Sequence, residues 1–305
     1  MNRNLLVECV PNFSEGRSRE VVDAIESAIC SVAGSVVLHR TSDLDHNRSV
    51  ITYAGLGNSV LESAVLAARV ALERIDLNGH RGVHPRLGAL DVLPFVPLTG
   101  TPLEYCVELA HEAGRRIWEE VGIPVYFYEA AARTPERVRL EHVRRGEFEG
   151  VGEAIRSDPS RRPDVGGPQL HPTAGAVIAG ARKFLIAYNI NLRTEDIAVA
   201  KEIARNIRTS SGGLPAVKAL GLALPSRGLV QVSMNLTDFE QTPVHVVFLE
   251  VARLAEQRGI EVEESELIGL MPRKAIEMAA AGLLKMHDFH SDRVIENRIE
   301  SALIR

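Results

Sequence analysis

The sequence predicts an α+β protein built from two ferredoxin-like α/β sandwich subdomains with a cleft between them. Short apolar runs typical of strands alternate with longer runs of helical period along the 305 residues. The resulting order, β-α-β-β-α, is found twice with similar element lengths. The ferredoxin-like βαββαβ unit, a sheet with helices on one face, is the simplest fold with this order. A dinucleotide-binding α/β fold is less favoured because Ala54–Ser59 lacks its glycine fingerprint.

The first copy of the pattern occupies residues 5–75. Apolar residues between positions 18 and 34 share one helical face, Ser18 can cap the helix start, and Gly34 can end the helix. A polar loop at 42–48 joins two strands. The predicted elements of this copy are strands at 5–10, 35–41 and 49–55 and helices at 18–34 and 59–75.

The second copy begins after a glycine- and proline-rich segment in the middle of the chain. Thr194 can cap its first helix, which has acidic residues in the first turn. The predicted elements of this copy are strands at 183–191, 216–224, 229–236 and within 260–272, and helices at 194–208 and 243–259. We therefore predict an N-terminal domain at 1–179 and a C-terminal domain at 180–305.

Composition and charge exclude several classes of protein. The chain is 45% hydrophobic and has a formal net charge of −5, which argues against nucleic acid as a partner. No apolar run reaches the ~18 residues that a membrane helix needs, and the first residues lack the apolar core of a signal peptide. We therefore expect a cytoplasmic protein without a membrane partner. Cys9, Cys30 and Cys106 are odd in number and widely spaced, which is typical of reduced, mostly buried thiols.

The loop at 77–91 concentrates groups that can do chemistry. It contains two histidines, two arginines, three glycines and a proline. Pro85 disfavours helical geometry at His84, so an extended His84 can project its ring into a cleft and exchange a proton near pH 7. His80 and His84 would be neighbours only on a helix, so the loop predicts no metal site. The alternative interpretation is an ordinary histidine in a surface loop.

Other polar side chains are candidates for substrate binding. Asp43 and Asp45 could hold a cationic group, while Arg48 and Arg86 could bind a carboxylate. The alternative for the loop at 42–49 is a polar hairpin turn. Two asparagines complete the set, one at the end of the first strand and one at the equivalent strand end of the second copy. The candidate substrate-binding residues are Asp43, Asp45, Arg48, Arg86, Asn12 and Asn189.

Two further segments have contrasting interpretations. Six of the thirteen residues in Pro163–Gly175 are glycine or proline. This composition fits a flexible linker, but a position between two similar domains favours an ordered loop that presents backbone N–H groups to a ligand. The arginines in Arg133–Arg145 alternate with glutamates on a helical stretch, so we interpret them as a solvated face.

Five motifs carry a resemblance to a known family. Residues 7–17, 45–55, 82–97, 180–192 and 232–240 closely resemble the formiminotransferase family. The resemblance implies transfer of the formimidoyl group from N-formimidoyl-L-glutamate to N5 of tetrahydrofolate, releasing glutamate, in histidine degradation. It also implies a folate tunnel between the two subdomains, a homodimer, tetrahydrofolate as co-substrate and no metal.

The resemblance extends to individual residues. It implies that His84, in the motif HPR-GALD, is the catalytic residue. The chain ends at residue 305, so it resembles the stand-alone transferase, with a separate cyclodeaminase as a possible partner. The folate-binding residues that the resemblance implies are Gly166, Gly167, Pro168, Gln169, Leu170, His171, Pro172, Thr173, Ala174 and Gly175.

Two alternative functions remain open at this point. The first is formyl transfer between 5-formyltetrahydrofolate and glutamate, because a formyl and a formimidoyl group have nearly the same shape. The second is a non-catalytic protein that binds folate or an amino acid, since ferredoxin-like repeats also serve as ligand sensors.

Overall fold

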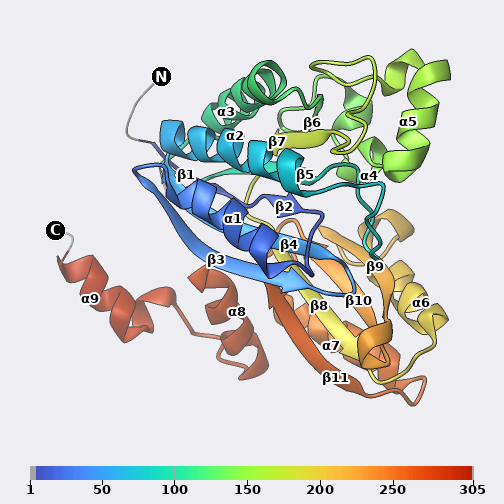
Figure 1. The fold of residues 1–305 in the computed structure, drawn as a ribbon. Coiled ribbons are helices and arrows are strands. Elements are labelled where there is room, and N and C mark those ends of the chain that lie inside the picture. Colours follow the sequence, from blue (N-terminus) through green and yellow to red (C-terminus); the bar gives the residue numbers. More distant parts are fainter. Residues whose placement is uncertain (1–4, 99, 304–305) are drawn as a thin grey trace. The chain divides into compact units, whose positions relative to one another are not determined.

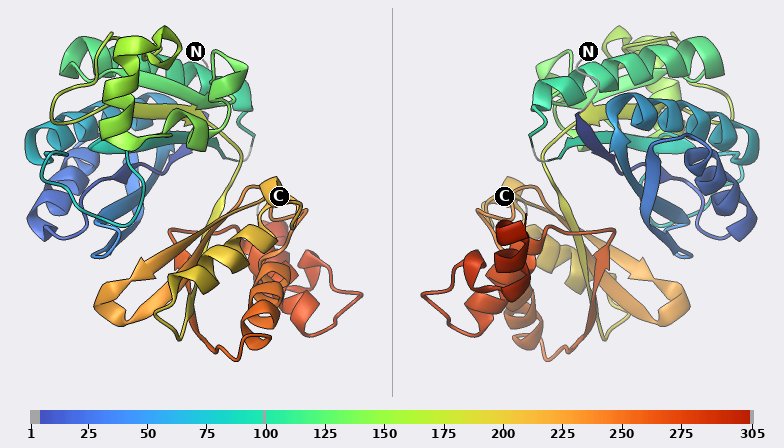
Figure 2. Two further views of the ribbon diagram at one scale, coloured as in Figure 1. Left: turned by 90° about the vertical axis from the view of Figure 1, so that its right-hand side faces the viewer. Right: turned by 90° about the vertical axis from the view of Figure 1, so that its left-hand side faces the viewer.

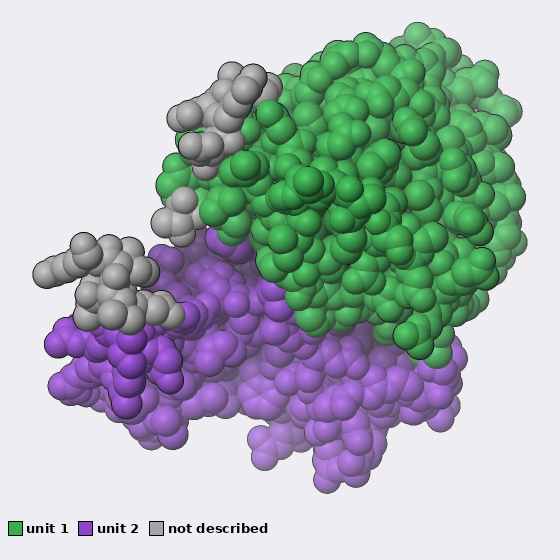
Figure 3. Space-filling view, turned by 60° about the vertical axis from the view of Figure 1, so that its left-hand side comes forward, with its two compact units in different colours: residues 1–183 green, residues 184–305 purple. Residues whose placement is uncertain are grey.

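The computed structural model describes residues 5–98 and 100–303 (Figure 1) and divides into two compact units, residues 1–183 and 184–305 (Figure 3). The predicted domain boundary after residue 179 falls inside a strand of the first unit. Each unit has its own sheet and its own hydrophobic core. The fold is therefore α+β, with one seven-stranded and one four-stranded sheet.

The described residues of the first unit form seven strands. The strands are β1 (Leu6–Cys9), β2 (Asn12–Phe13), β3 (Ser35–Asp43), β4 (Arg48–Leu56), β5 (Leu90–Pro97), β6 (Val125–Glu129) and β7 (Val177–Ala181). The helices are α1 (Arg19–Cys30), α2 (Gly57–Arg74), α3 (Leu103–Arg116), α4 (Leu140–Val143) and α5 (Glu147–Ser157). Shorter helical turns are η1 (Ile117–Val121), η2 (Pro135–Arg137) and η3 (Pro159–Arg161).

The sheet of the first unit contains the predicted ferredoxin-like arrangement and an extension. Strands β3, β4, β1 and β5 pair antiparallel in this order, which is the strand order of a βαββαβ unit. Strand β2 continues the course of β1 between β4 and β5. Beyond β5 the sheet continues with β7 and β6, both in parallel pairing. The extension was not predicted.

Helices cover both faces of this sheet. Helices α1, α2 and α3 bury their apolar sides on one face, against fully buried side chains such as Phe13, Tyr53 and Phe95. On the other face, α4 and α5 pack on β5, β6 and β7 through a second cluster that includes Tyr126 and Val151. Because successive residues of a strand face opposite sides, β6 contributes Phe127 to one cluster and Tyr126 and Tyr128 to the other.

The start of α1 follows the prediction, but its end does not. The Oγ of Ser18 accepts a hydrogen bond from the backbone N–H of Val21 at 3.4 Å, which satisfies one of the unpaired N–H groups at the helix start. The helix ends at Cys30, before the predicted end at Gly34. Gly34 instead adopts a φ of +83° in the turn that leads into β3, a conformation that favours glycine.

The second unit is a four-stranded sheet with helices on one face. All neighbouring strands are antiparallel, in the order β11-β8-β10-β9, which is again the ferredoxin-like order. Figure 2 shows α6 and α7 on one face of this sheet. The strands are β8 (Ile186–Leu192), β9 (Val217–Leu224), β10 (Leu229–Leu236) and β11 (Val262–Ile268). The helices are α6 (Ile197–Ile207), α7 (Val244–Glu256), α8 (Arg273–Leu283) and α9 (Ile295–Leu303), with short turns η4 (Thr209–Ser211), η5 (Pro225–Arg227) and η6 (Ser291–Arg293).

The capping residue of α6 differs from the predicted one. Asp196 precedes the helix, and its Oδ1 accepts a hydrogen bond from the backbone N–H of Ala198 at 2.9 Å. Thr194 lies two residues earlier, and its Oγ1 accepts from the N–H of Asp196 at 3.2 Å. Both residue types suit a helix start, so sequence alone did not separate them. Within the two described ranges, no helix combines the length and the apolarity needed to cross a bilayer.

Candidate active site

The loop between α2 and β5 carries His84, and a buried carboxylate holds its backbone in place. Asp91 lies near the start of β5 and is fully buried. Its Oδ1 accepts hydrogen bonds from the N–H groups of Leu87 at 2.7 Å and Gly88 at 3.2 Å. Hydrogen bonds from N–H groups to a carboxylate are stronger than those between neutral groups. The loop after His84 is therefore anchored to the first residues of a central strand.

The His84 ring is oriented by its own chain. Its Nδ1 lies 2.9 Å from the backbone oxygen of Pro85. Because a carbonyl oxygen only accepts, Nδ1 carries the hydrogen and Nε2 is the nitrogen with a lone pair. The side chain is half-buried, and the ring of His46 lies beside it with ring centres 5.6 Å apart. This tautomer presents Nε2 as a base.

Buried Arg48 and half-buried Arg144 share the carboxylate of Asp91. The Nη1 of Arg48, on β4, donates to Oδ2 of Asp91 at 2.8 Å, and the Nη1 of Arg144 donates to the same oxygen at 3.2 Å. The side chains of Arg48 and Arg144 are 8% and 11% exposed. Burial alone would raise the pKa of Asp91, but Arg144, Arg48 and the N–H of Leu87 together lower it. Asp91 is therefore ionised at neutral pH.

Arg144 corrects one prediction from the sequence. The stretch at 133–145 was interpreted as a solvated helical face, but regular α-helix is limited to the four residues of α4. The side chain of Arg144 is only 11% exposed. That of Arg137 is 14% exposed and pairs at 2.6 Å with Asp164, whose side chain is 6% exposed. Arg145, by contrast, is exposed. The alternation of charges in the sequence does not distinguish Arg144 from Arg145. The structure does, because α4 ends at Val143 and Arg144 then turns toward β5.

The surroundings of His84 keep its imidazole neutral. Burial lowers the pKa of His84 well below its ordinary value, and the positive charges of Arg48 and Arg144 lower it further. His46 acts in the same direction, while the hydrogen bond to Pro85 acts weakly against it. At pH 7 the ring is therefore an uncharged base.

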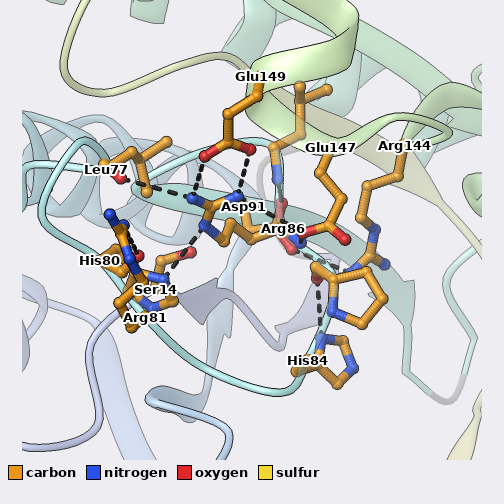
Figure 4. Close-up of polar contacts among 12 residues, drawn as sticks. Ser14, Leu77, His80, Arg81, His84, Arg86, Asp91, Arg144, Glu147 and Glu149 are labelled. Carbon is orange, nitrogen blue, oxygen red and sulfur yellow. Dashed lines mark hydrogen bonds and ion pairs between the residues drawn. The ribbon is translucent and has the colours of Figure 1, made fainter.

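The second histidine of the loop is part of an ion-pair network (Figure 4). The Nδ1 of His80 accepts from Nε of Arg86 at 3.1 Å, and its Nε2 donates to the backbone oxygen of Asn47 at 2.8 Å. The Nη2 of Arg86 pairs with Glu149 at 2.7 Å, and its Nη1 lies 3.5 Å from Glu147. The hydrogen bond from Arg86 lowers the pKa of Glu149 to about 2. This network joins the loop to α5.

The turn between β3 and β4 packs against the His84 loop. The backbone N–H of Val83 donates to the oxygen of Asp45 at 3.0 Å. A Cβ added at Gly82 would lie 2.2 Å from the oxygen of His46, so this position requires glycine. The Oδ1 of Asp43 accepts from the N–H of His46 at 2.7 Å and thereby shapes the turn. The predicted residues Asp43 and Asp45 thus lie on a segment that touches the loop of His84.

Asn12 lies on β2 and contacts a second predicted residue. Its Oδ1 accepts from Nε of Arg48 at 3.1 Å, and its Nδ2 donates to the backbone oxygen of Val10 at 2.9 Å. The predicted residues Asn12 and Arg48 are therefore direct neighbours, and Asp91 lies next to them through Arg48. Three strands, β2, β4 and β5, supply this cluster.

The segment at 166–175 is ordered and lies beside the same loop. The N–H of Leu77 donates to the oxygen of Thr173 at 2.8 Å, and the N–H of Ala89 donates to the oxygen of Ala174 at 2.9 Å. Gly175 has a φ of +66°, and an added Cβ would lie 2.0 Å from the oxygen of Leu87. The segment therefore forms part of the first unit and is attached at both ends of the His84 loop. The segment is therefore ordered, while its presentation of backbone N–H groups to a ligand stays a prediction.

Asn189 lies in the second unit, on β8. It is 4% exposed and stands opposite Glu266 of β11 in the strand register. Its neighbour on the same face, Asn191, donates to Glu264 and Glu266 at 3.1 and 3.0 Å and accepts from Gln231 at 2.9 Å. The face of this sheet opposite α6 and α7 is therefore polar around Asn189.

Cysteines and metal ligands were also considered in the sequence. Cys9, Cys30 and Cys106 are free thiols; the first and third are buried, and burial raises the pKa of each of these two to about 12. Cys30 is exposed, so two of the three thiols are buried. Among the residues whose positions are described, no three His, Cys, Asp or Glu side chains gather where they could hold a metal ion.

Comparison with known proteins decides the family. Residues 6–182 match the model of the N-terminal subdomain of the formiminotransferase domain, and residues 187–303 match the model of the formiminotransferase domain. The chain belongs to the formiminotransferase family. As a member of this family it is a transferase enzyme.

Relatives of this formiminotransferase have two architectures. A glutamate formimidoyltransferase of Thermoplasma acidophilum is 44% identical, over 97% of this chain and 98% of that protein. A second one, of Streptococcus pyogenes, is 41% identical over 96% of this chain and 98% of that protein. A formimidoyltransferase-cyclodeaminase of Sus scrofa is 44% identical over 96% of this chain but only 56% of that protein. This formiminotransferase thus matches the stand-alone relatives over nearly their whole length.

Sequence reasoning missed three residues of the candidate site. The sequence does mark Asp91, because it is a lone acidic residue near the start of an otherwise apolar strand. A charge buried at such a position needs partners. His46 and Arg144 had no such signal, since each lies in a polar stretch among similar residues. Their positions depend on the pairing of β3 with β4 and on the packing of α4.

Proposed function

We propose that this formiminotransferase transfers the formimidoyl group from N-formimidoyl-L-glutamate to N5 of tetrahydrofolate and releases glutamate, as a step of histidine degradation. The names of its relatives support both the group and the glutamate. The observation that carries the proposal is the His84 ring. It is held by Nδ1, is neutral at pH 7, and has the ordered segment at 166–175 attached to its own loop.

The chemistry needs two proton transfers. The formimidoyl group on glutamate is an amidine, which is protonated at neutral pH and electrophilic at its carbon. N5 of tetrahydrofolate attacks this carbon, and a tetrahedral species forms. The N5 nitrogen must then lose a proton and the glutamate nitrogen must gain one, because the amine leaves only when it is protonated. The carbon–nitrogen bond to glutamate breaks as its electron pair stays on that nitrogen.

His84 can perform both transfers in sequence. Neutral Nε2 takes the proton from N5, and the resulting imidazolium gives a proton to the departing glutamate nitrogen, so the ring ends as it began. Neither a covalent intermediate nor a metal is required in this scheme. Holding both reactants at contact distance would supply much of the remaining acceleration.

The remaining predicted residues have assigned roles within this proposal. Folate would lie along Gly166–Gly175, where the exposed part of the segment offers backbone groups. Asp43 or Asp45 would face the positively charged amidine. A carboxylate of the substrate at Arg48 or Arg86 would join an existing ion pair, since each guanidinium already contacts a carboxylate of the protein. The polar groups that we assign to the glutamate side chain are completed by Asn12 and Asn189.

The resemblance to the family also supports three proposals about context. The protein would act as a homodimer in the cytoplasm. It would hand its folate product to a separate cyclodeaminase, because the fused relatives carry that function in one chain with the transferase. The direction of transfer, toward tetrahydrofolate, is part of the same proposal.

A pair of histidine variants tests the role of His84. We expect His84→Ala to lower turnover by roughly 10²–10⁴-fold, the usual contribution of general acid–base catalysis, while the affinity for tetrahydrofolate stays nearly unchanged. The exposed His287 provides the matched control, and His287→Ala should keep full turnover. Turnover is measured as formation of 5-formimidoyltetrahydrofolate. Near-normal turnover in His84→Ala would remove this ring from the chemistry.

The same assay separates the alternative functions. Incubation with formimidoylglutamate and tetrahydrofolate should yield 5-formimidoyltetrahydrofolate and glutamate in equal amounts. A product only from 5-formyltetrahydrofolate and glutamate would favour formyl transfer and overturn the proposed donor. Binding of both molecules without any product would favour the non-catalytic protein.

A further inference from the structure

Arg144 touches the backbone group that orients the His84 ring. Its Nη1 donates to the backbone oxygen of Pro85 at 2.6 Å, and the Nδ1–H of His84 donates to the same oxygen at 2.9 Å. The same Nη1 also donates to the buried Asp91 at 3.2 Å. Arg144 therefore links the carbonyl beneath the imidazole to a carboxylate that is fixed in the central sheet. Figure 4 shows Arg144 above His84.

Two constraints fix the position of Arg144, the packing of α4 and the ion pair with Asp91. Arg144 follows α4 directly, and α4 packs on the sheet through Val143. The guanidinium of Arg144 donates to Oδ2 of Asp91, and Arg48 on β4 donates to the same oxygen. An arginine that is 11% exposed and has a buried charged partner is costly to place. Solvation of a surface helix does not account for such an arrangement.

The groups around His84 carry more positive than negative charge. Arg48 faces the ring from β4, Arg144 from the end of α4, and His46 from the turn between β3 and β4. Asp91, from β5, is the carboxylate next to them, and both arginines share it. A ring near two guanidinium groups that share one carboxylate is harder to protonate than a ring in water.

We propose that Arg144 is a positioning residue for His84, which fixes the Pro85 carbonyl beneath the ring and supplies positive charge beside it. This inference rests on the proposed function, because it assigns Arg144 a task only if His84 moves protons. The two effects serve the two halves of the reaction. The fixed carbonyl keeps Nε2 as the base that accepts the proton of N5. The adjacent positive charge makes the imidazolium a stronger acid when it delivers that proton to the leaving amine.

Two substitutions at Arg144 and one at its neighbour test this inference. Arg144→Met removes the charge and the donor but keeps an apolar stem, while Arg144→Lys keeps a charge and a donor. Arg145→Met is the matched control, because Arg145 is adjacent and exposed. The measurements are kcat, KM and the pH dependence of kcat/KM. The folded state is checked by circular dichroism and thermal melting, and the tautomer of His84 by nitrogen NMR of the ring.

The expected results differ for each variant. In Arg144→Met, kcat falls about 10–100-fold with little change in KM. The low-pH limb of the kcat/KM profile shifts to higher pH by roughly one unit, because loss of a nearby positive charge makes the His84 ring easier to protonate. Arg144→Lys keeps the limb near its original position and recovers most of kcat. Arg145→Met behaves like the parent enzyme. In the ring NMR spectrum, the Nδ1–H tautomer dominates in the parent and is mixed in Arg144→Met.

Specific outcomes would overturn the inference. If Arg144→Met folds normally and its low-pH limb stays in place, Arg144 is structural only. If Arg144→Met does not fold, Arg144→Lys decides, because loss of the Nδ1–H tautomer there without any loss of kcat contradicts positioning. A different result, full turnover in His84→Ala, would contradict the proposed function itself. The two failures are therefore distinguishable.

Discussion

At the scale of single residues, Asp91 holds the backbone after His84 and two arginines together. Its two oxygens accept from two backbone N–H groups and two arginines. Asparagine in its place could still accept from the N–H of Leu87, but Arg48 and Arg144 would lose their negative partner inside the protein. Unpaired buried charges of this kind are strongly destabilising.

We expect Asp91→Asn to lower the free energy of unfolding by about 3–5 kcal/mol. Urea denaturation at pH 7 measures this loss. Glu240→Gln is the control, because Glu240 and its partner Lys274 are both more than half exposed, and such a pair contributes at most about 1 kcal/mol. Equal effects of the two substitutions would show that the buried pairing is unimportant for stability.

The stability of the parent protein relative to Asp91→Asn should depend on pH with a definite sign. The pKa of Asp91 is lower in the folded than in the unfolded chain. Its contribution is therefore complete above about pH 4, the ordinary pKa of an aspartate, and is lost as the pH falls from there toward the folded pKa. The difference between the two proteins should shrink in this range.

At the residue scale, the sequence predicted His84, Arg48 and Asn12 but missed Asp91, which connects the loop to the arginines. His84 was predicted because proline after histidine and surrounding glycines constrain the loop, and these are local signals. Arg48 and Asn12 were predicted separately, and the structure shows them in contact. Their link through Asp91 to Arg144 joins residues 53 positions apart in the chain. Pairings of that separation are decided by the fold and leave no local pattern.

At the scale of elements, the segment at 166–175 is joined to the His84 loop at a position that admits only glycine. Ala89 and Leu77 bond to its backbone, and Gly175 passes over Leu87 with no room for a Cβ. A larger residue there would push the two segments apart. The loop with the base and the segment assigned to folate would then lose their common geometry.

We expect Gly175→Ala to destabilise the protein by about 2–5 kcal/mol, from a strained φ together with a backbone clash, and to weaken binding of tetrahydrofolate. Thermal unfolding and titration calorimetry measure the two effects. Gly212→Ala is the control, since Gly212 has a φ of +83° with nothing within 4 Å of an added Cβ. It should cost only about 1 kcal/mol and leave tetrahydrofolate binding intact. Unchanged tetrahydrofolate binding in a folded Gly175→Ala protein would contradict the assigned role of the segment.

Prediction of elements succeeded where periodicity is strong. The helices α1, α2, α6 and α7 and the strands β1, β3, β4, β8, β9, β10 and β11 follow the expected positions to within a few residues. No range was predicted for β5, the fourth strand of the first ferredoxin-like core. Strand β7 was missed because its sequence, VIAGA, directly follows the glycine-rich segment and reads as part of a loop. Its strand conformation comes from pairing with β5 and β6, which flank it on both sides.

At the scale of the whole molecule, two units with similar strand order have separate cores. The core of the first unit includes Leu93 and that of the second includes Ile190, and both side chains are fully buried. Sequence analysis found the repeat because each half has the same order of elements. It could not find the parallel extension by β6 and β7, because strand pairing across α3 and α5 is not visible in a linear pattern.

We expect Leu93→Ala and Ile190→Ala each to lower stability by about 2–5 kcal/mol, through lost burial and the cavity left behind. Native-state hydrogen exchange should show the loss mainly in the sheet that carries the substitution, because each core packs its own sheet. Val246→Ala, at an exposed position of α7, is the control and should change neither sheet. Equal loss of protection in both sheets after either core substitution would show that the molecule opens as one cooperative body.

The hydrogen bond from Nδ1 of His84 to the carbonyl of Pro85 leaves one ring nitrogen for the reactants. In the proposed mechanism, a ring that is tethered by Nδ1 meets both reactants with Nε2. Because that mechanism has no intermediate in which the enzyme itself carries the formimidoyl group, both molecules must be present together before either product departs. Initial-rate plots at several fixed concentrations of one substrate should intersect, as in a ternary-complex scheme, whereas parallel lines would signify a modified enzyme that waits between two half-reactions.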